Sequence, residues 1–242
     1  MQRGQNAKAA KVFEGLLRKT PSDPRLLFAA TQFYFRNARR LDLAVKLADR
    51  LVKKVPESAD AQVLAAEVFL QAQNRKRAHH HAQIANAKAP DTAKVLTLMA
   101  AVHVAEAEFD TALPYAEKAL AKNPNDLGAK YQLARILVTQ GRFDETLALV
   151  NEILEEMPDA LAAIGIYLQA QSISADDPVI QHMRDDMLPR FRMAKRPDLP
   201  QLLKLLGGAY NQIGAYDEAF RSFAAAKDLE PKKYDKMRYA QF

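Results

Sequence analysis

The stretch from Pro200 to Pro231 reads PQLLKLLGGAYNQIGAYDEAFRSFAAAKDLEP, and its spacing of small and large residues decides the fold. Gly207 and Ala219 are small, as is required where two paired helices cross closely. Tyr210 and Phe223 are large enough to fill the space between the same two helices. The stretch therefore predicts two antiparallel helices joined by a tight turn.

The turn and the end of this stretch carry the remaining signals. Gly214 permits a left-handed turn conformation, Pro231 stops the second helix, and Ala226 is placed to meet a following helix. The whole pattern closely resembles the 34-residue tetratricopeptide repeat (TPR), a helix pair that stacks into a solenoid. The resemblance implies a scaffold with a binding surface.

Prolines set a period along the rest of the chain. Pro56, Pro90, Pro124 and Pro158 are each 34 residues apart, and Pro21 precedes the first of them by 35. Aligning the sequence on these prolines produces three columns of mostly small or apolar residues. The columns are Ala9, Ala44, Ala78, Ala112, Thr146 and Ala219; Phe13, Ala48, Ala82, Ala116, Val150 and Phe223; and Leu16, Leu51, Ala85, Ala119, Ile153 and Ala226.

The predicted fold is all-α: a right-handed TPR superhelix, or α-α solenoid, of about six helix-pair units spanning 1–242, with the first unit incomplete. Polar residues that can cap helices precede each first helix, namely Asp23, Ser58, Asp91, Asp126, Asp159 and Asp198. The predicted elements are a lone second helix at 7–20, regular repeats at 24–56, 58–90, 91–124 and 126–158, an irregular repeat at 159–198, a final repeat at 199–231, and a partial capping helix at 232–242.

The irregular repeat carries about five extra residues. Asp177 is expected to cap its second helix, and Pro189 is expected to end that helix. A basic loop follows, which would either clamp an anionic ligand or serve as a solvated connector. Its basic residues are Arg190, Arg192, Lys195 and Arg196.

The chain begins in the middle of a unit, since 7–20 matches only a second helix. Phe13, Leu16 and Leu17 are expected to meet nothing upstream, whereas the ends of solenoids normally carry a polar face. Two explanations fit: the chain was cut from a longer protein, or this face docks onto another chain.

Charge is unevenly distributed over the 242 residues, whose net charge is +6. Residues 1–56 carry 13 basic against 4 acidic residues, and residues 91–158 carry 6 against 11. The gradient predicts an acidic partner near the N-terminal end or head-to-tail association of copies, although solvated outer faces would also explain it. No nucleic-acid recognition motif, signal peptide or long apolar run is present in the sequence. We therefore expect a cytoplasmic chain that does not bind nucleic acid and does not span a membrane.

No group of residues in the sequence predicts catalysis, a metal or a cofactor, so the chain is not expected to be an enzyme. His79, His80 and His81 are consecutive and point about 100° apart on a helix, so they are interpreted as surface residues. His103 falls in a core column and is expected to be packed, and His182 is expected to be isolated on an exposed face.

The concave face of the first helices is the predicted binding site, where a peptide or helix would lie. Val63, Leu70 and Val104 could instead be contacts between neighbouring helices. The predicted partner-binding residues are Phe33, Arg36, Asn37, Glu67, Leu70, Gln71, Lys94, Thr97, Tyr131, Arg135 and Val138.

The C-terminal third resembles a narrower family. The run DDPVIQHM from Asp176 to Met183, followed by an insert and by the final repeat, is similar to the TPR region of bacterial TPR-sulfotransferase proteins. That family's donor-binding loop has no counterpart in these 242 residues. The leading prediction is a non-catalytic, bacterial protein–protein interaction scaffold. The alternatives are the recruiting region of such a sulfotransferase and a self-assembling scaffold that uses the helix at 7–20.

Overall fold

The computed structural model describes residues 2–38 and 40–229, and within them every regular element is a helix. The predicted all-α fold is confirmed. Pro231 and the predicted capping residues 232–242 lie outside the described ranges. The chain divides into two compact units, one up to Ile136 and one from Leu137 onward, and each is described by itself.

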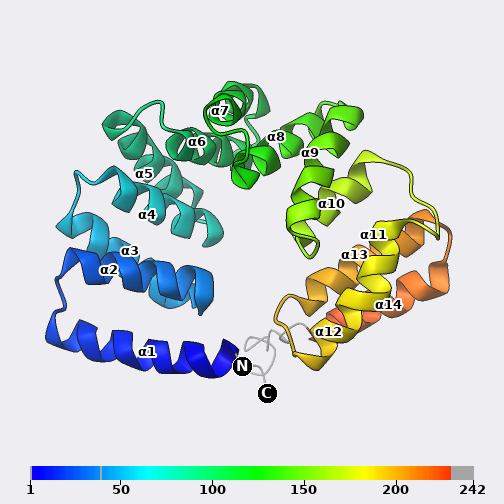
Figure 1. Ribbon diagram of the computed structural model, residues 1–242, viewed down its shortest axis with the longest axis horizontal. Helices are drawn as coiled ribbons and strands as arrows, with labels where there is room; N and C mark the ends of the chain where they lie inside the picture. The colour runs from blue at the N-terminus through cyan, green and yellow to red at the C-terminus, as the bar shows by residue number, and fades with distance from the viewer. Residues whose placement is uncertain (1, 39, 230–242) are drawn as a thin grey trace, which may run out of the picture. The chain divides into compact units, whose positions relative to one another are not determined.

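The first unit begins with a single helix and continues as helical hairpins (Figure 1). Helix α1 packs on the first hairpin, and α2, α4 and α6 pair with α3, α5 and α7 respectively. The bounds are α1 Gln2–Lys19, α2 Pro24–Gln32, η1 Phe33–Asn37, α3 Leu41–Lys54, α4 Ala59–Gln71, α5 Arg75–Lys88, α6 Ala93–Ala105, α7 Phe109–Lys122 and α8 Leu127–Thr139. Element η1 is a π-helical end to α2.

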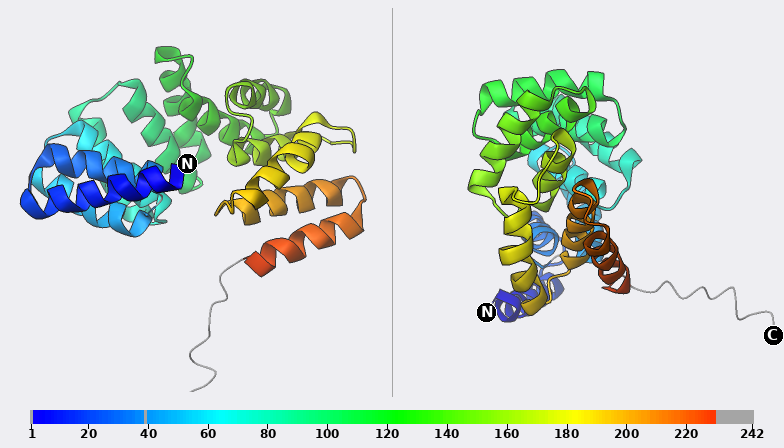
Figure 2. Two further views of the ribbon diagram at one scale, coloured as in Figure 1. Left: turned by 60° about the horizontal axis from the view of Figure 1, so that its bottom comes forward. Right: turned by 90° about the vertical axis from the view of Figure 1, so that its right-hand side faces the viewer.

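In the second unit, α13 and α14 form a hairpin, and α10 contacts both α9 and α13. Figure 2 shows α11, η2 and α12 following one another as a rod beside α13. The bounds are α9 Phe143–Glu156, α10 Leu161–Ala170, α11 Pro178–Gln181, η2 His182–Met187, α12 Leu188–Met193, α13 Leu199–Gln212 and α14 Tyr216–Leu229.

The turns between paired helices repeat with the same period as the prolines. Gln73, Ala107 and Gly141 have φ angles of 59°, 62° and 72°, and Gly214 has a φ of 78°. The left-handed conformation expected at Gly214 is confirmed. At Gln73 and Ala107 a residue with a side chain adopts the same conformation, which shows that the turn belongs to the repeat and not to glycine alone.

Four of the predicted helix caps are confirmed by their hydrogen bonds. The Asp23 carboxylate accepts from the backbone N–H of Arg25 at 2.9 Å. Ser58, Asp126 and Asp177 accept from backbone N–H groups in the first turns of α4, α8 and α11. Each cap satisfies a donor that the helix itself leaves unpaired.

The other three predicted caps are wrong in detail. Asp91 has a φ of 68°, and Thr92 takes the cap position of α6. Asp159 lies before Ala160, which precedes α10, and its carboxylate binds Arg190 instead. Asp198 occupies the cap position of α13, but its carboxylate pairs with Arg196 at 2.6 Å. Asp159 and Asp198 bind guanidinium groups instead of capping a helix, because a hydrogen bond between two charged groups is stronger than one to a neutral backbone N–H.

The three sequence columns form the core between paired helices. Interior members of each column, such as Ala48, Ala82 and Leu51, are buried. Some members of the first and last units are exposed, as Leu16 and Phe223 are at 44% each, whereas Ala219 and Ala226 of the last unit are buried. The burial therefore follows the position of a repeat along the solenoid as well as its sequence.

Helix α1 is better packed than the sequence suggested. Phe13 stacks on Phe33 with ring centroids 4.9 Å apart. Leu17 packs against the buried core of the first hairpin, which includes Leu27 and Tyr34. These two side chains face the following hairpin, and the expectation that they meet nothing upstream stays a prediction. Val12 and Leu16 form the edge that remains uncovered, at 60% and 44% exposed.

Pro189 does not end the second helix of the irregular repeat, contrary to expectation. It lies in the first turn of α12, directly after the π-helical segment η2. The backbone N–H of Leu188 bonds the carbonyl of Met183, five residues back. This wider turn changes the hydrogen-bond register where proline lacks a donor, so the helix continues to Met193 and part of the predicted loop is helical.

Candidate functional site

The predicted groove residues of the first unit come from η1, α4, α6 and α8, the first helices of successive hairpins. Bonds between neighbouring first helices place several of them together. Arg36 donates to Glu67 at 2.8 Å, and Lys94 donates to Asp60 at 3.0 Å. The Thr97 hydroxyl donates to the Asp126 carboxylate at 3.1 Å. These bonds form a polar ladder along one face of the unit.

The ladder changes what this face offers to a partner. Arg36 and Lys94 already have carboxylate partners, so their charges are compensated within the chain. Such exposed ion pairs each contribute little to stability, and a partner has to compete with them. A cation on this face that lacks a carboxylate partner among the described residues is therefore the more available one.

Arg135 on α8 fits that description. Its guanidinium lies 5.7 Å from the centroid of the Tyr131 ring and donates to the Gln132 side chain at 3.3 Å. A half-buried aromatic ring beside an arginine is a combination enriched at the energetic centres of interfaces. Tyr131 and Arg135 are thus the strongest binding candidates on this face.

The apolar members of the predicted set divide into two groups. Phe33 and Leu70 are half-buried and pack against the hydrophobic core formed by α2, α3 and α4. Val63 and Val104 are almost fully buried, at 1% and 3% exposed, so they are helix contacts and not partner contacts. Asn37 and Gln71 are exposed at the ends of η1 and α4, and Val138 belongs to the second unit.

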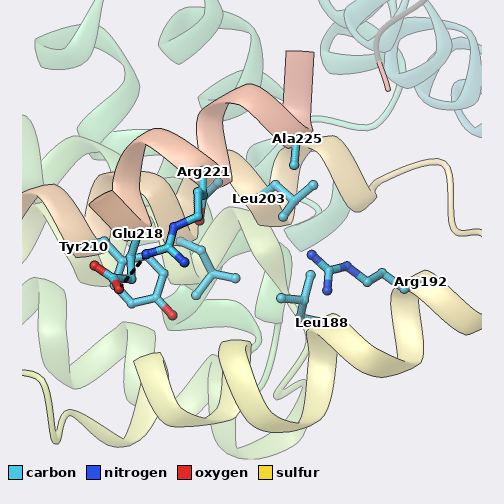
Figure 3. A pocket seen from close by; sticks show the side chains of 9 residues that line it. Leu188, Arg192, Leu203, Tyr210, Glu218, Arg221 and Ala225 are labelled. Carbon is cyan, nitrogen blue, oxygen red and sulfur yellow. Dashed lines mark hydrogen bonds and ion pairs between the residues drawn. The ribbon is translucent and has the colours of Figure 1, made fainter. Parts of the chain in front are cut away.

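The second unit has a small pocket of its own between α12, α13 and α14 (Figure 3). Its volume is about 180 Å³, with Leu188 and Leu203 in its wall, which is below the usual size of a small-molecule site. Arg192 and Arg221 both point toward this space, and Arg221 pairs with Glu218 at 3.1 Å. The pocket has room for one side chain of a partner.

The basic insert is mostly used within the unit. Arg190 bridges Asp159 and Asp186 at 2.8 Å each, and Arg196 lies 3.8 Å over the centroid of the Phe191 ring. Arg190 therefore lies on α12 and not in a loop, whereas Arg196 lies in the connection between α12 and α13, where it packs on Phe191. Arg192 is the member of the insert that points to the pocket.

Histidines are more engaged than the sequence suggested. His81 is buried, stacks on Phe69 at 5.2 Å and bonds the Gln62 side chain at 2.7 Å. Burial, followed by the nearby positive charges, lowers the pKa of His81 to about 4. His103 is packed as expected, but His79 contacts Glu106 at 2.8 Å. The interpretation of the three consecutive histidines as surface residues is confirmed for His80, which is exposed, and was wrong for His81.

His182 is also not isolated. Its Nε2 lies 3.2 Å from Asp159 and its Nδ1 lies 3.5 Å from Asp186, in the cluster that Arg190 bridges. The hydrogen bond from Arg190 is the main cause that lowers the pKa of Asp159, and His182 adds to it. Arg190 bridges both carboxylates, so this cluster is an internal ion-pair network.

The network makes stability depend on pH in a definite direction. Asp159 has a lower pKa in the folded state, so its contribution is present above the ordinary aspartate pKa and is lost as pH falls through the folded value. We expect Arg190→Ala to lose about 1 kcal/mol at pH 7, because the pair is partly exposed and screened. Urea unfolding at pH 7 and pH 3 should show this difference shrink at the lower pH. An undiminished difference at pH 3 would assign the loss to packing and not to charge.

Comparisons with known proteins agree with this helical architecture. Residues 34–91 and 103–171 each match a family described as tetratricopeptide repeat, and together the matches cover just over half of the chain. The chain is a TPR protein. TPR domains typically act without catalysis, and both matched families describe the repeat alone.

Solved TPR structures resemble this TPR protein in fold. A TPR protein of Thermus thermophilus is 23% identical, with 69% of this chain and 91% of that chain covered and a TM-score of 0.56. A TPR protein of Parabacteroides merdae is 15% identical over 96% of this chain and 89% of that chain, with a TM-score of 0.63. No curated protein matches the chain.

A third structure is the Cut9–Hcn1 hetero-tetramer of the APC/C. Its matched chain is 12% identical, with 94% of this chain and 46% of that chain covered and a TM-score of 0.67. At these identities the likeness shows the TPR solenoid fold alone. Among the described residues, none of the helices has the length and apolar character to cross a bilayer.

Proposed function

We propose that this TPR protein is a protein–protein interaction scaffold that binds a peptide or helix along the first helices of its first unit. The observation that supports this most is the pairing of Tyr131 with Arg135 beside a ladder whose cations, Arg36 and Lys94, already have carboxylate partners. A carboxylate of the partner would bind Arg135, and an apolar partner side chain would pack on the Tyr131 ring. Phe33 and Leu70 would supply apolar contacts toward the other end.

The experiment compares two variants in binding to peptides selected from a displayed library. We expect the triple variant Arg36→Ala, Tyr131→Ala, Arg135→Ala to bind at least about tenfold more weakly, because truncating interface tyrosine and arginine residues commonly costs over 1 kcal/mol. The control variant, Lys53→Ala with Lys118→Ala, changes exposed residues of the second helices α3 and α7. Equal binding by both variants, measured by fluorescence anisotropy, would contradict the groove assignment.

Self-association is a second candidate, which the uncovered edge of α1 at Val12 and Leu16 favours. The charge gradient would add electrostatic attraction between copies, which salt weakens. Light scattering on the same samples at low and high salt separates this candidate from peptide binding by a monomer. The sulfotransferase relationship stays a prediction from the sequence, since the two matched families describe only the repeat.

A further inference from the structure

Two imidazoles and two carboxylates meet where α5 lies against the turn between α6 and α7. His79 Nδ1 lies 2.8 Å from Glu106 Oε2, and His103 Nδ1 lies 2.8 Å from Glu108 Oε2. The two imidazole rings stand edge to face with centroids 5.6 Å apart. Ligand atoms of His103, Glu106 and Glu108 all lie within 4.8 Å of one another. We propose that this cluster, the His79–Glu108 cluster, binds one divalent transition-metal ion, with Zn²⁺ as the ion that suits it best.

The backbone places these side chains together. Helix α6 ends at Ala105, and Ala107 turns the chain with a φ of 62°. The backbone N–H of Glu108 then bonds the carbonyl of His103 at 2.9 Å, which brings the chain back onto the histidine. The two glutamates consequently flank His103 from one turn, and α5 supplies His79 from the preceding hairpin. The site joins two consecutive repeats.

The chemistry of the donor set favours zinc. Two neutral imidazoles with two carboxylates carry a charge of −2, which a divalent ion neutralises. Zinc accepts nitrogen and carboxylate ligands at about 2.0–2.2 Å, so its ligand atoms in a tetrahedron lie about 3.3 Å apart. His79 and Glu106 lie 2.8 Å apart, and the ligand atoms of His103, Glu106 and Glu108 lie within 4.8 Å of one another, so side-chain rotations would have to bring the four ligands to this spacing. Magnesium and calcium prefer oxygen ligands alone and would leave the imidazoles unused.

Neighbouring side chains hold the imidazoles in place. The Tyr115 ring stacks on His103 at 5.6 Å with 12° between the planes. The amide of Gln83 lies 2.8 Å from His79 Nε2 and donates to it, so the neutral ring carries its proton on Nδ1 toward Glu106. With a metal on Nδ1, this proton moves to Nε2, and the Gln83 amide turns over to accept it, as neighbours of metal-bound histidines commonly do.

Burial is graded across the cluster in a way that allows an ion to enter. The His103 side chain is 10% exposed, Glu106 is 23% exposed, and Glu108 is 52% exposed. The buried members fix the geometry, and Glu108 gives access from solvent. The cluster of Asp159, His182 and Asp186 has similar ligands, but Arg190 already supplies its positive charge, so it serves as an internal control.

The test titrates Zn²⁺ alone into protein first treated with a chelator, with binding followed by calorimetry and thermal unfolding. We expect one equivalent to bind and the Tm to rise by about 5 °C or more at a hundredfold excess over Kd, because the ion binds only the folded chain. Co²⁺ should give the visible absorption of a tetrahedral complex, and Mg²⁺ should leave the Tm unchanged.

Variants assign the ion to these residues. The His79→Asn and Glu106→Gln variants, and the half-exposed Glu108→Gln variant, should each weaken Zn²⁺ binding at least about tenfold. His80→Asn and His182→Asn, as matched controls, should bind like the wild type. The assignment is overturned by the absence of a one-equivalent transition in the wild type, or by a loss in the controls equal to that in the three cluster variants. It is also overturned if folded Glu108→Gln and Glu106→Gln both bind like the wild type.

Discussion

Replacing Phe191 with alanine is expected to lower the free energy of unfolding of the second unit by about 3–5 kcal/mol. Phe191 lies on α12 and is fully buried, at 0% exposed. The Arg196 guanidinium covers its ring at 3.8 Å. The substitution removes the ring from a core that also contains Met183 and Met187, and the surrounding helices can only partly close the resulting cavity.

Hydrogen exchange resolved along the chain is the measurement that suits this prediction. Amides of α12 and α13 should lose protection, whereas amides of α2 to α6 should keep theirs, because repeats interact only with their neighbours. Met193→Ala is the matched control on the same helix, since Met193 is 83% exposed and surface changes usually stay within about 0.5 kcal/mol. A loss below about 1 kcal/mol for Phe191→Ala would mean that the insert behaves as the loop predicted from sequence.

The repeat signal explains how much of the fold the sequence predicts. Interior column residues such as Ala48 and Ala82 are buried because a 34-residue period places each against the next hairpin. The same reasoning failed at Pro189, where a π-helical segment supplies a register that a proline rule does not consider. It also failed at Asp159, where a residue 31 positions later in sequence determines the role of the carboxylate.

The candidate sites were harder to predict because their residues come from different hairpins. His79 and Glu106 are 27 residues apart, so a search for ligands three or four apart on one helix misses them. A signal was present nonetheless, since Glu106 follows His103 by three residues and Glu108 by five. Opposite charges 31 residues apart recur as ion pairs, as in Lys88 with Glu57 and Lys122 with Asp91. The 31-residue spacing of opposite charges could thus have predicted these ion pairs from the sequence.

Replacing each of the adjacent glycines of α13, Gly207 and Gly208, with alanine is expected to change the stability of the second unit in opposite directions. A Cβ added at Gly207 would lie 2.7 Å from the Phe223 ring, whereas one added at Gly208 would meet nothing within 4 Å. Gly208→Ala should therefore stabilise the unit by about 0.5–1 kcal/mol, since alanine is the better helix former. Gly207→Ala should be less stable than Gly208→Ala by about 1–3 kcal/mol, which is the usual cost of overpacking.

Using the same substitution in the same helix removes the helix propensity from the comparison, so the difference reports the close approach of α13 and α14 alone. Urea unfolding of both variants measures it. The double variant Gly207→Ala, Phe223→Ala is the control, because without the ring the added methyl group has space. Its stability relative to Phe223→Ala should match the gain at Gly208. Phe223 is 44% exposed, so its ring has room to move. Equal stabilities of Gly207→Ala and Gly208→Ala would show that the ring turns into solvent without cost. In that case a glycine is not needed where these helices cross.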